Sequence, residues 1–337
     1  MTDDHGEIRT SRVECRDGVL IAIHHFGGGP TPLLVLAALG FPSKAYLPLV
    51  APLQDRFTCY GVDLRGHGDS PSGPGTDLLY HGEDVCTVVR SLGLEGACAF
   101  GHSLGGMAAV QAETLQPGTF SRIICYEPVL YSWQEDQELR HDHIRWTAPR
   151  LLKKVLTKRQ RYYASRQEAL RRFSGKPPWN RFAKEALEAY VEHGFKDVSV
   201  GVELKCDPAN ESNSMIFPTH LDPMLTLYPS LPKVGCPVSI LAGSDVSASD
   251  PTQFIASFIE KAVKEFPNAR FERLKGLQHL GPLEDPERIA KCILAHAGQA
   301  PSWSGSRSSL NSSSGSPSSA SPDSARAQAS PKVLSRL

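Results

Sequence analysis

Residues 101–105 have the sequence Gly-His-Ser-Leu-Gly and join an apolar run, Ala97–Phe100, to a helical pattern over Leu104–Leu115. In a G-x-S-x-G segment of this kind the chain turns sharply from a strand into a helix, and the serine takes unfavourable backbone angles. The glycines are needed because larger neighbouring side chains would clash in so tight a turn. With a strand before it and a helix after it, the pattern predicts a sheet with Ser103 Oγ raised above it.

The chain on either side of this turn alternates between strand and helix patterns. Arg16-Asp17-Gly18 separates two short strands and predicts a hairpin, and the unbroken apolar run Leu33–Ala38 is typical of a parallel strand that is buried on both faces. This order predicts an α/β fold, a mostly parallel sheet with helices on both faces. We expect further strands at residues 57–62, 97–100, 123–126, 237–242 and 270–274, and helices at about 44–54, 82–91, 104–115, 250–265 and 286–297, the fourth capped by Asp250 and Pro251.

A largely helical region interrupts this alternation at residues 130–231. We interpret it as a cap inserted over the carboxyl edge of the sheet, where α/β folds bind ligands, and assign residues 8–129 and 232–299 to the core. Residues 300–337 form a predicted disordered tail, because 15 of the last 37 residues are Ser and few are large and apolar. From Arg150 to Lys184 the cap has 12 Lys and Arg residues but one acid, Glu168. This run could attract an anionic substrate such as an acyl-CoA, although a solvated helix face is the favoured interpretation.

Charge and composition exclude several classes of protein. The 36 basic residues balance 36 acidic ones, which argues against a nucleic-acid binder. No run of 18 apolar residues is present, so we expect no membrane-spanning helix, and the acidic start of the chain is unlike a secretory signal. The eight cysteines include no C-x-x-C pair, and His141 and His143 have no evident third metal ligand. We therefore expect an intracellular protein with no metal and no cofactor.

A serine nucleophile needs a base, and in this type of fold the chain order is Ser, acid, His. His279 fits this order, because it lies in a glycine-rich loop after the last strand. The acid should orient the imidazole and stabilise its charged form. We favour Asp245, which follows the strand at 237–242, and keep Glu127, which follows the strand ending at Tyr126, as the alternative acid.

Two backbone N–H groups are candidate donors to an oxyanion. The first is that of Leu104, directly after the nucleophile. The second should come from the loop after Leu33–Ala38, where Phe41 is followed by Pro42, a residue without an N–H. We therefore predict Leu104 and Phe41 as the oxyanion donors.

The last three residues, Ser335-Arg336-Leu337, are similar to the C-terminal Ser-Lys-Leu address of peroxisomal proteins. An import receptor must bind such a tripeptide in an extended form, and a flexible tail would present it. We expect a peroxisomal protein that binds this receptor, or a cytoplasmic one if the tripeptide is fortuitous.

Together these residues resemble the α/β-hydrolase superfamily over about residues 10–299. Asp63-Leu64-Arg65-Gly66-His67-Gly68-Asp69-Ser70 is similar to its D-x-R-G-H-G-x-S loop, and Gly281–Glu287 is similar to the segment after its catalytic histidine. We interpret the Asp63–Ser70 loop as structural. Members usually have His-Gly at the oxyanion loop, whereas Leu39 replaces the histidine here, a difference that leaves the backbone donors in place. The segments Tyr126–Leu130, Tyr190–Asp197 and Leu204–Cys206 resemble a group of microbial serine hydrolases, and the closing tripeptide resembles that of fungal peroxisomal hydrolases linked to secondary metabolism.

The resemblance implies a serine hydrolase acting on a small-molecule ester or thioester. Ser103 would attack the acyl carbon, His279 would move the proton, and Asp245 would orient His279. A carbon–carbon bond hydrolase would need the same residues. Two further hypotheses are a non-catalytic ligand-binding protein that has kept the pocket, and a scaffold whose functional part is the Ser-rich tail.

Overall fold

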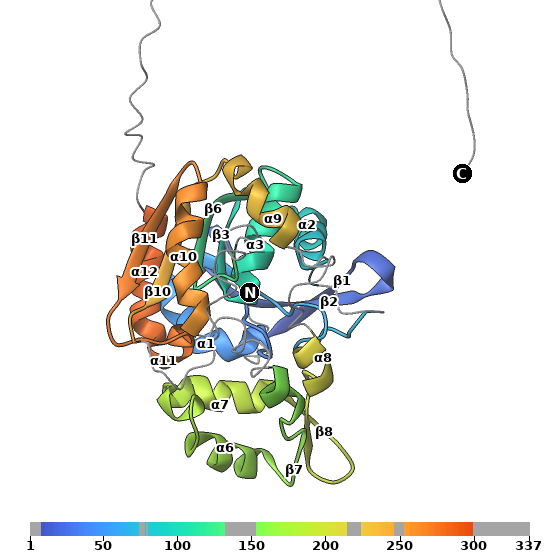
Figure 1. Cartoon of the computed structure of the whole chain (residues 1–337). Coiled ribbons are helices and arrows are strands. Elements are labelled where there is room, and N and C mark those ends of the chain that lie inside the picture. The colour runs from blue at the N-terminus through green and yellow to red at the C-terminus, as the bar shows by residue number, and fades with distance from the viewer. Residues whose placement is uncertain are drawn as a thin grey trace, which may run out of the picture. The chain divides into compact units, whose positions relative to one another are not determined.

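The computed structural model describes residues 8–73, 78, 80–131, 153–213, 224–245 and 253–298. Its main feature is an eight-stranded sheet with the order β1-β2-β4-β3-β5-β6-β10-β11 (Figure 1). β2 is antiparallel to β1 and to β4, and the other neighbouring pairs are parallel, which confirms the predicted α/β sheet. The strands are β1 (Arg9–Glu14), β2 (Leu20–Gly28), β3 (Thr31–Leu36), β4 (Phe57–Val62), β5 (Ala97–His102), β6 (Phe120–Tyr126), β10 (Val238–Gly243) and β11 (Ala269–Leu274).

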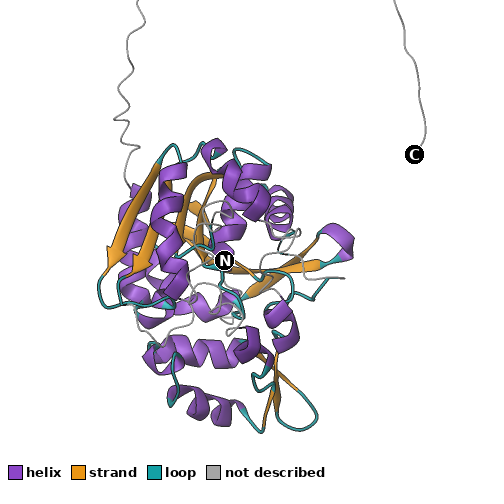
Figure 2. Ribbon diagram, viewed as in Figure 1, coloured by secondary structure: helices purple, strands orange, loops and turns teal. Residues whose placement is uncertain are grey.

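Helices pack on both faces of the sheet (Figure 2). Buried apolar residues form two clusters, of which the first includes side chains of α2 (His81–Leu92), α3 (Leu104–Leu115), α9 (Met224–Leu227) and α10 (Gln253–Glu265). The second includes side chains of α1 (Leu47–Val50), α6 (Arg166–Ser174), α7 (Lys184–His193), α11 (Gly281–Glu284) and α12 (Pro286–Gly298). Within the described ranges, no helix combines the length and the apolar character needed to cross a membrane.

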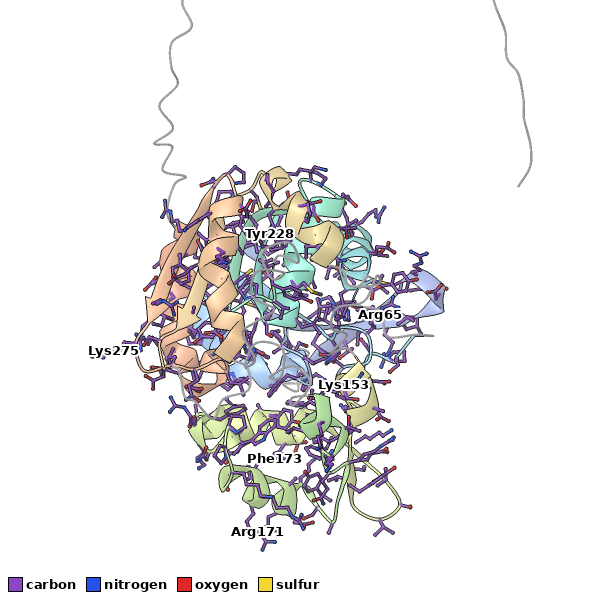
Figure 3. All side chains as sticks on the ribbon, viewed as in Figure 1. Arg65, Lys153, Arg171, Phe173, Tyr228 and Lys275 are labelled. Atoms are coloured by element: carbon purple, nitrogen blue, oxygen red, sulfur yellow. The ribbon has the colours of Figure 1, made fainter. Side chains whose placement is uncertain are left out.

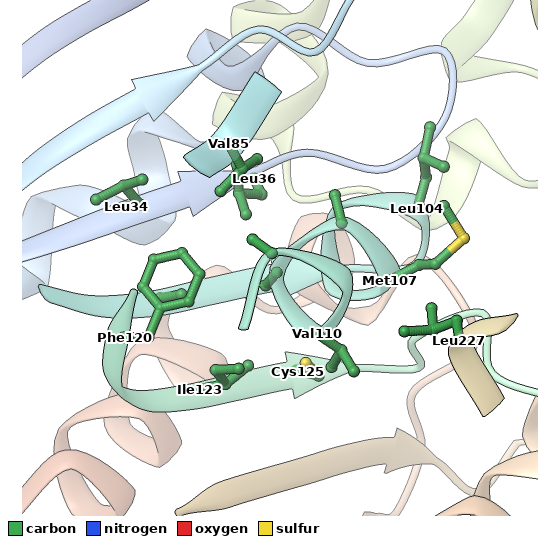
Figure 4. Packing of buried hydrophobic residues seen from close by; sticks show 14 of the residues in the cluster. Leu34, Leu36, Val85, Leu104, Met107, Val110, Phe120, Ile123, Cys125 and Leu227 are labelled. Atoms are coloured by element: carbon green, nitrogen blue, oxygen red, sulfur yellow. The ribbon is translucent and has the colours of Figure 1, made fainter. Parts of the chain in front are cut away.

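The central strand β3 shows why its sequence is an unbroken apolar run. Leu34 and Leu36 belong to the first cluster, whereas Leu33 and Val35 belong to the second, and all four are fully buried. Successive side chains of a strand point to opposite faces, so a strand covered on both sides needs apolar residues at every position. Figure 4 shows the first cluster, in which side chains of α2 and α3 pack against those of β3 and β6.

The predicted hairpin is confirmed, but the helix predicted at 44–54 is not continuous. β1 and β2 pair across Arg16–Gly18, where Asp17 has a positive φ of 61°. Instead of one helix, the chain forms short turns: 3₁₀ segments at Ser43–Tyr46 and Ala51–Leu53 on either side of α1. Pro48 and Pro52 are the physical reason, since proline has no N–H and clashes with the preceding helical turn.

The region between β6 and β10, predicted to be largely helical, also contains a small antiparallel sheet. Its strand order is β7 (Tyr162–Tyr163), β9 (Val202–Leu204), β8 (Phe195–Asp197). It accompanies α6, α7 and α8 (Pro208–Asn213) in the lower part of Figure 1. The boundaries of core, cap and tail stay predictions. His141, His143, the Asp250–Pro251 cap and the tail with Ser335, Arg336 and Leu337 lie outside the described residues.

Candidate active site

Ser103 lies in the sharp turn between β5 and α3 that the sequence predicts. Its backbone angles, φ 52° and ψ −111°, are strained for a residue with a side chain. A Cβ atom on Gly105 would overlap the backbone oxygen of Leu36, so only glycine lets α3 begin so close to the end of β3. The turn leaves Ser103 buried at 5% exposure, beside the residues that follow β6 and β11.

His279 joins Ser103 to a carboxylate. Its Nε2 is 3.1 Å from Ser103 Oγ, and its Nδ1 is 2.7 Å from Glu127 Oε2. An ionised carboxylate can only accept, so Nδ1 carries the proton, and Nε2 is left to accept from the Ser103 hydroxyl. A base that contacts a hydroxyl and is oriented by a third group is the arrangement that activates a serine nucleophile.

Glu127 is held by the neighbouring strand β10. It directly follows β6, has a positive φ of 42° and is 3% exposed. Its backbone N–H donates to Leu241 O at 2.9 Å, and its Oε1 accepts the N–H of Gly243 at 2.9 Å. With both its backbone and one carboxylate oxygen fixed by β10, Glu127 has Oε2 available for His279.

Asp245, the acid favoured from the sequence, does not contact His279. Its side chain is 49% exposed and lies 3.6 Å from Arg181, while its backbone N–H donates to Leu277 O at 3.0 Å. The expected contact is therefore wrong, and Glu127, the alternative acid, makes it instead. The reason lies at the end of β10. There the backbone N–H of Gly243 faces Glu127, whereas the carboxylate of Asp245 points outward to Arg181.

The two predicted oxyanion donors differ in their present bonding. Leu104 is the first residue of α3, and the first N–H groups of a helix have no intrahelical acceptor. The N–H of Phe41 donates to Ala38 O at 3.1 Å. Phe41 would have to share or leave that acceptor to bind an oxyanion, whereas Leu104 would not.

Aromatic side chains of the region after β6 enclose Phe41, a contact that sequence reasoning missed. The ring of Phe41 lies 5.1 Å from that of Tyr190 and 5.5 Å from that of Trp179, measured between ring centroids. Phe173, labelled in Figure 3, extends this cluster to Trp179 at 4.6 Å. These aromatic residues are separate positions in the sequence, and only the fold shows that they surround Phe41, in the loop predicted to bind an oxyanion.

A buried ion pair lies beside the same loop. Arg159 donates to both carboxylate oxygens of Glu211, at 2.8 and 2.7 Å, and also to the hydroxyl of Tyr190. A Cβ atom on Gly40 would overlap the Glu211 carboxylate. Gly40 is therefore packed directly against the Arg159–Glu211 pair.

The basic run of the predicted cap is partly neutralised by acids that follow it in the chain. The sequence window from Arg150 to Lys184 does not include these partners, which is why it looks so basic. Exposed members such as Arg171 extend outward (Figure 3). The ion pairs with later acids include Arg159–Glu211, Arg161–Asp207, Arg166–Glu192 at 3.6 Å, Lys184–Glu188 at 3.9 Å, Arg181–Glu284 at 3.1 Å and Arg181–Asp245 at 3.6 Å, with Arg161–Glu203 and Arg166–Asp197 also in contact.

The Asp63–Ser70 loop brings His24, Asp63 and Asp69 close together. Asp63 accepts hydrogen bonds from His24 Nε2 at 2.9 Å and from the N–H and hydroxyl of Ser43, each at 2.7 Å. Burial alone would raise the pKa of Asp63, but these hydrogen bonds lower it below its usual range. Lys44 and Lys205 both contact Asp69. With the carboxylates already supplied with donors and cations, we interpret the cluster as structural.

Comparison with known proteins agrees with this fold. A family model described as "Alpha/beta hydrolase family" matches residues 21–291. The 3-oxoadipate enol-lactonase 1 of Acinetobacter baylyi is 30% identical over 131 residues, 39% of this chain and 49% of that protein, so the match spans about half of this curated relative. The crystal structure of E-2-(acetamidomethylene)succinate hydrolase gives a TM-score of 0.69 at 22% identity, covering 87% of this chain and all of that one. A peroxisomal α/β-hydrolase of Saccharomyces cerevisiae gives a TM-score of 0.62 at 17% identity, covering 86% of this chain and 87% of that one.

Proposed function

The chain belongs to the α/β-hydrolase family, and from this premise we propose that it is a serine hydrolase of a small-molecule ester or thioester. One observation carries the proposal: the hydrogen-bonded chain from Ser103 through His279 to Glu127. The relatives support a hydrolytic reaction, since one is named a lactonase and another a hydrolase. We infer from the chemistry of the site that the bond cleaved is an ester or a thioester.

In the proposed reaction His279 accepts a proton from Ser103 and later donates it to the leaving group. Ser103 Oγ attacks the acyl carbon while its proton passes to His279 Nε2, and the resulting imidazolium donates from Nδ1 to Glu127. The N–H of Leu104 binds the oxyanion. Collapse of the intermediate expels the alcohol or thiol, which takes the proton from His279 and leaves an acyl group on Ser103. Water then attacks the acyl group with His279 as the base, and Ser103 leaves with the proton as the carboxylic acid is released.

The first test compares wild type with Ser103→Ala on p-nitrophenyl acyl esters and on acyl-CoA thioesters of increasing chain length. We expect turnover that is lost in the variant, and labelling of wild type, but not of the variant, by a fluorophosphonate. The preferred series identifies the bond that is cleaved. Labelling without turnover would overturn the ester or thioester proposal, and a wild type that is neither labelled nor active would overturn the hydrolase proposal as a whole.

We also propose that the C-terminal Ser335-Arg336-Leu337 directs the protein to peroxisomes. The similarity of this tripeptide to Ser-Lys-Leu supports the proposal. A fluorescent protein fused to the N-terminus should enter peroxisomes with the full chain and stay in the cytoplasm when the last three residues are deleted. Equal distribution of the two fusions would contradict the proposal.

A further inference from the structure

The loop that carries His279 is held at two successive carbonyl groups. Nε2 of His102 lies 2.8 Å from the carbonyl oxygen of His279, and the hydroxyl of Tyr126 donates to the carbonyl oxygen of Gln278 at 2.7 Å. His102 is the residue before Ser103, and Tyr126 is the residue before Glu127. The two strands that present the nucleophile and the acid therefore also hold the backbone of the base.

The direction of the first hydrogen bond is fixed by a longer chain. The backbone N–H of Ala38 donates to Tyr46 Oη at 3.1 Å, and Tyr46 Oη lies 2.7 Å from His102 Nδ1. A backbone carbonyl can only accept, so His102 must donate from Nε2 to His279. In the neutral ring Nδ1 then accepts, and the hydroxyl of Tyr46 must point toward it. This series of hydrogen bonds thus connects Ala38, at the start of the predicted oxyanion loop, with His279, and the donor of each bond in it is fixed.

Burial keeps these groups neutral. His102, Tyr46 and Tyr126 are each fully buried. Burial, with a smaller contribution from nearby His279, lowers the pKa of His102 well below its usual value, and burial raises the pKa of both tyrosines. The rings of His102 and His279 are 5.3 Å apart. A neutral His102 does not repel the positive charge that the proposed reaction places on His279.

We propose that His102, oriented by Tyr46, and Tyr126 are positioning residues that hold the backbone of His279 so that Nε2 stays within reach of Ser103 Oγ. This inference rests on the proposed function for its kinetic consequence and on the hydrogen bonds alone for its structural one. The two hydrogen bonds, from His102 and from Tyr126, should contribute unequally. Gln278 O also accepts the N–H of Gly281 at 2.9 Å, so loss of the Tyr126 hydroxyl should matter less than loss of the His102 donor.

The test uses His102→Leu, which removes the donor, His102→Gln, which keeps an amide donor, and Tyr46→Phe, which deletes one oxygen. Tyr163→Phe is the matched control, because Tyr163 is a buried tyrosine whose ring packs against Phe173 and Phe195, away from His102 and His279. Since a displacement of about 1 Å can cost about 100-fold in rate, we expect kcat to fall by about 100-fold in His102→Leu and about 10-fold in Tyr46→Phe. KM should stay within about twofold, because His102 and Tyr46 are fully buried and offer no surface to a substrate, and His102→Gln should recover part of the loss.

A second readout does not depend on turnover. The proton on His279 Nδ1, hydrogen-bonded to Glu127, should give a low-field proton resonance that disappears in His279→Gln. We expect this resonance to move or broaden in Tyr46→Phe and to stay in place in Tyr163→Phe. If His102→Leu does not fold, Tyr46→Phe decides the kinetic test.

Three results separate this inference from the proposed function. If Tyr46→Phe had the same resonance and the same kcat as Tyr163→Phe, the positioning role would be overturned. The positioning role would also be overturned if the activity of His102→Leu and Tyr46→Phe fell only in proportion to the amount of folded protein, measured by circular dichroism at the assay temperature. A wild type without turnover or labelling would overturn the proposed function, and the resonance would still decide whether Tyr46 and His102 hold His279.

Discussion

The ends of β6 and β10 are the most informative comparison within this molecule. The two strands are parallel neighbours, so they end at the same edge of the sheet, and an acidic residue follows each of them. Glu127, after β6, is 3% exposed and contacts His279, whereas the side chain of Asp245, after β10, is 49% exposed and faces Arg181. Two acidic residues at the same edge of the sheet therefore have different environments, and the surrounding backbone makes the difference.

The backbone after each strand explains where each carboxylate points. Glu127 has a positive φ, and its N–H donates to Leu241 O, which turns the side chain back toward Gly243. After β10 the chain instead continues alongside the end of β11 and the loop after it: the N–H groups of Ser244 and Asp245 donate to Leu274 O and Leu277 O. That pairing uses the backbone of Asp245 and leaves its side chain at the surface.

The largest expected effect comes from Glu127→Gln. A neutral amide cannot stabilise the imidazolium and also favours the wrong tautomer of His279, so we expect kcat to fall by about 10³- to 10⁴-fold. Steady-state kinetics on the best ester or thioester measures the loss. A decrease of less than tenfold, in a variant that binds a fluorophosphonate as fast as wild type, would show that Glu127 is not the acid.

Glu127→Asp should have an intermediate effect. It keeps the charge but shortens the side chain by one methylene, so the carboxylate cannot reach both Gly243 N–H and His279 Nδ1 at their present distances of 2.9 and 2.7 Å. We expect kcat to fall by about 10- to 100-fold, between wild type and Glu127→Gln. If Glu127→Asp were as inactive as Glu127→Gln, reach rather than charge would be the limiting property.

Asp69, in the loop after β4, is an acid of intermediate burial and tests the same comparison through stability. Burial would raise its pKa, but the hydrogen bond and charge of Lys205, with Lys44 and His24, lower the pKa to about 2. Because the pKa in the folded state is below the unfolded value of about 3.9, the charged carboxylate stabilises the protein above about pH 4, and this contribution is lost as the pH falls toward 2. Allowing for solvent screening, we expect it to be about 1 kcal/mol.

Urea unfolding of wild type and Asp69→Asn at pH 6 and pH 2.5 measures this contribution. The difference in free energy of unfolding should be present at pH 6 and shrink at pH 2.5. A difference that is the same at both values would mean that shape rather than charge at residue 69 stabilises the loop.

The sequence predicts the fold and two of the three contacting site residues, for reasons that are local. The Gly101–Gly105 turn, the apolar run at Leu33–Ala38 and the glycine-rich loop around His279 each have a pattern within about ten residues. The partner of His279 could not be predicted in this way. It depends on the φ of Glu127 and on the register of β6 with β10, and neither leaves a pattern in the sequence. The pairing of Arg159 with Glu211, 52 positions apart, could not be predicted from the sequence for the same reason.

Asp245→Asn should have the smallest effect of the four substitutions. A half-exposed ion pair with Arg181 at 3.6 Å contributes little, because water and salt screen both charges, so we expect the free energy of unfolding to change by less than about 0.5 kcal/mol. We expect kcat within about threefold of wild type, since the side chain contacts neither Ser103 nor His279. Measured beside Glu127→Gln under the same conditions, it removes the same charge from the same edge of the sheet. A loss in Asp245→Asn as large as in Glu127→Gln would mean that the acid moves to β10 during the reaction, and that the hydrogen bond to Glu127 belongs to the resting enzyme alone.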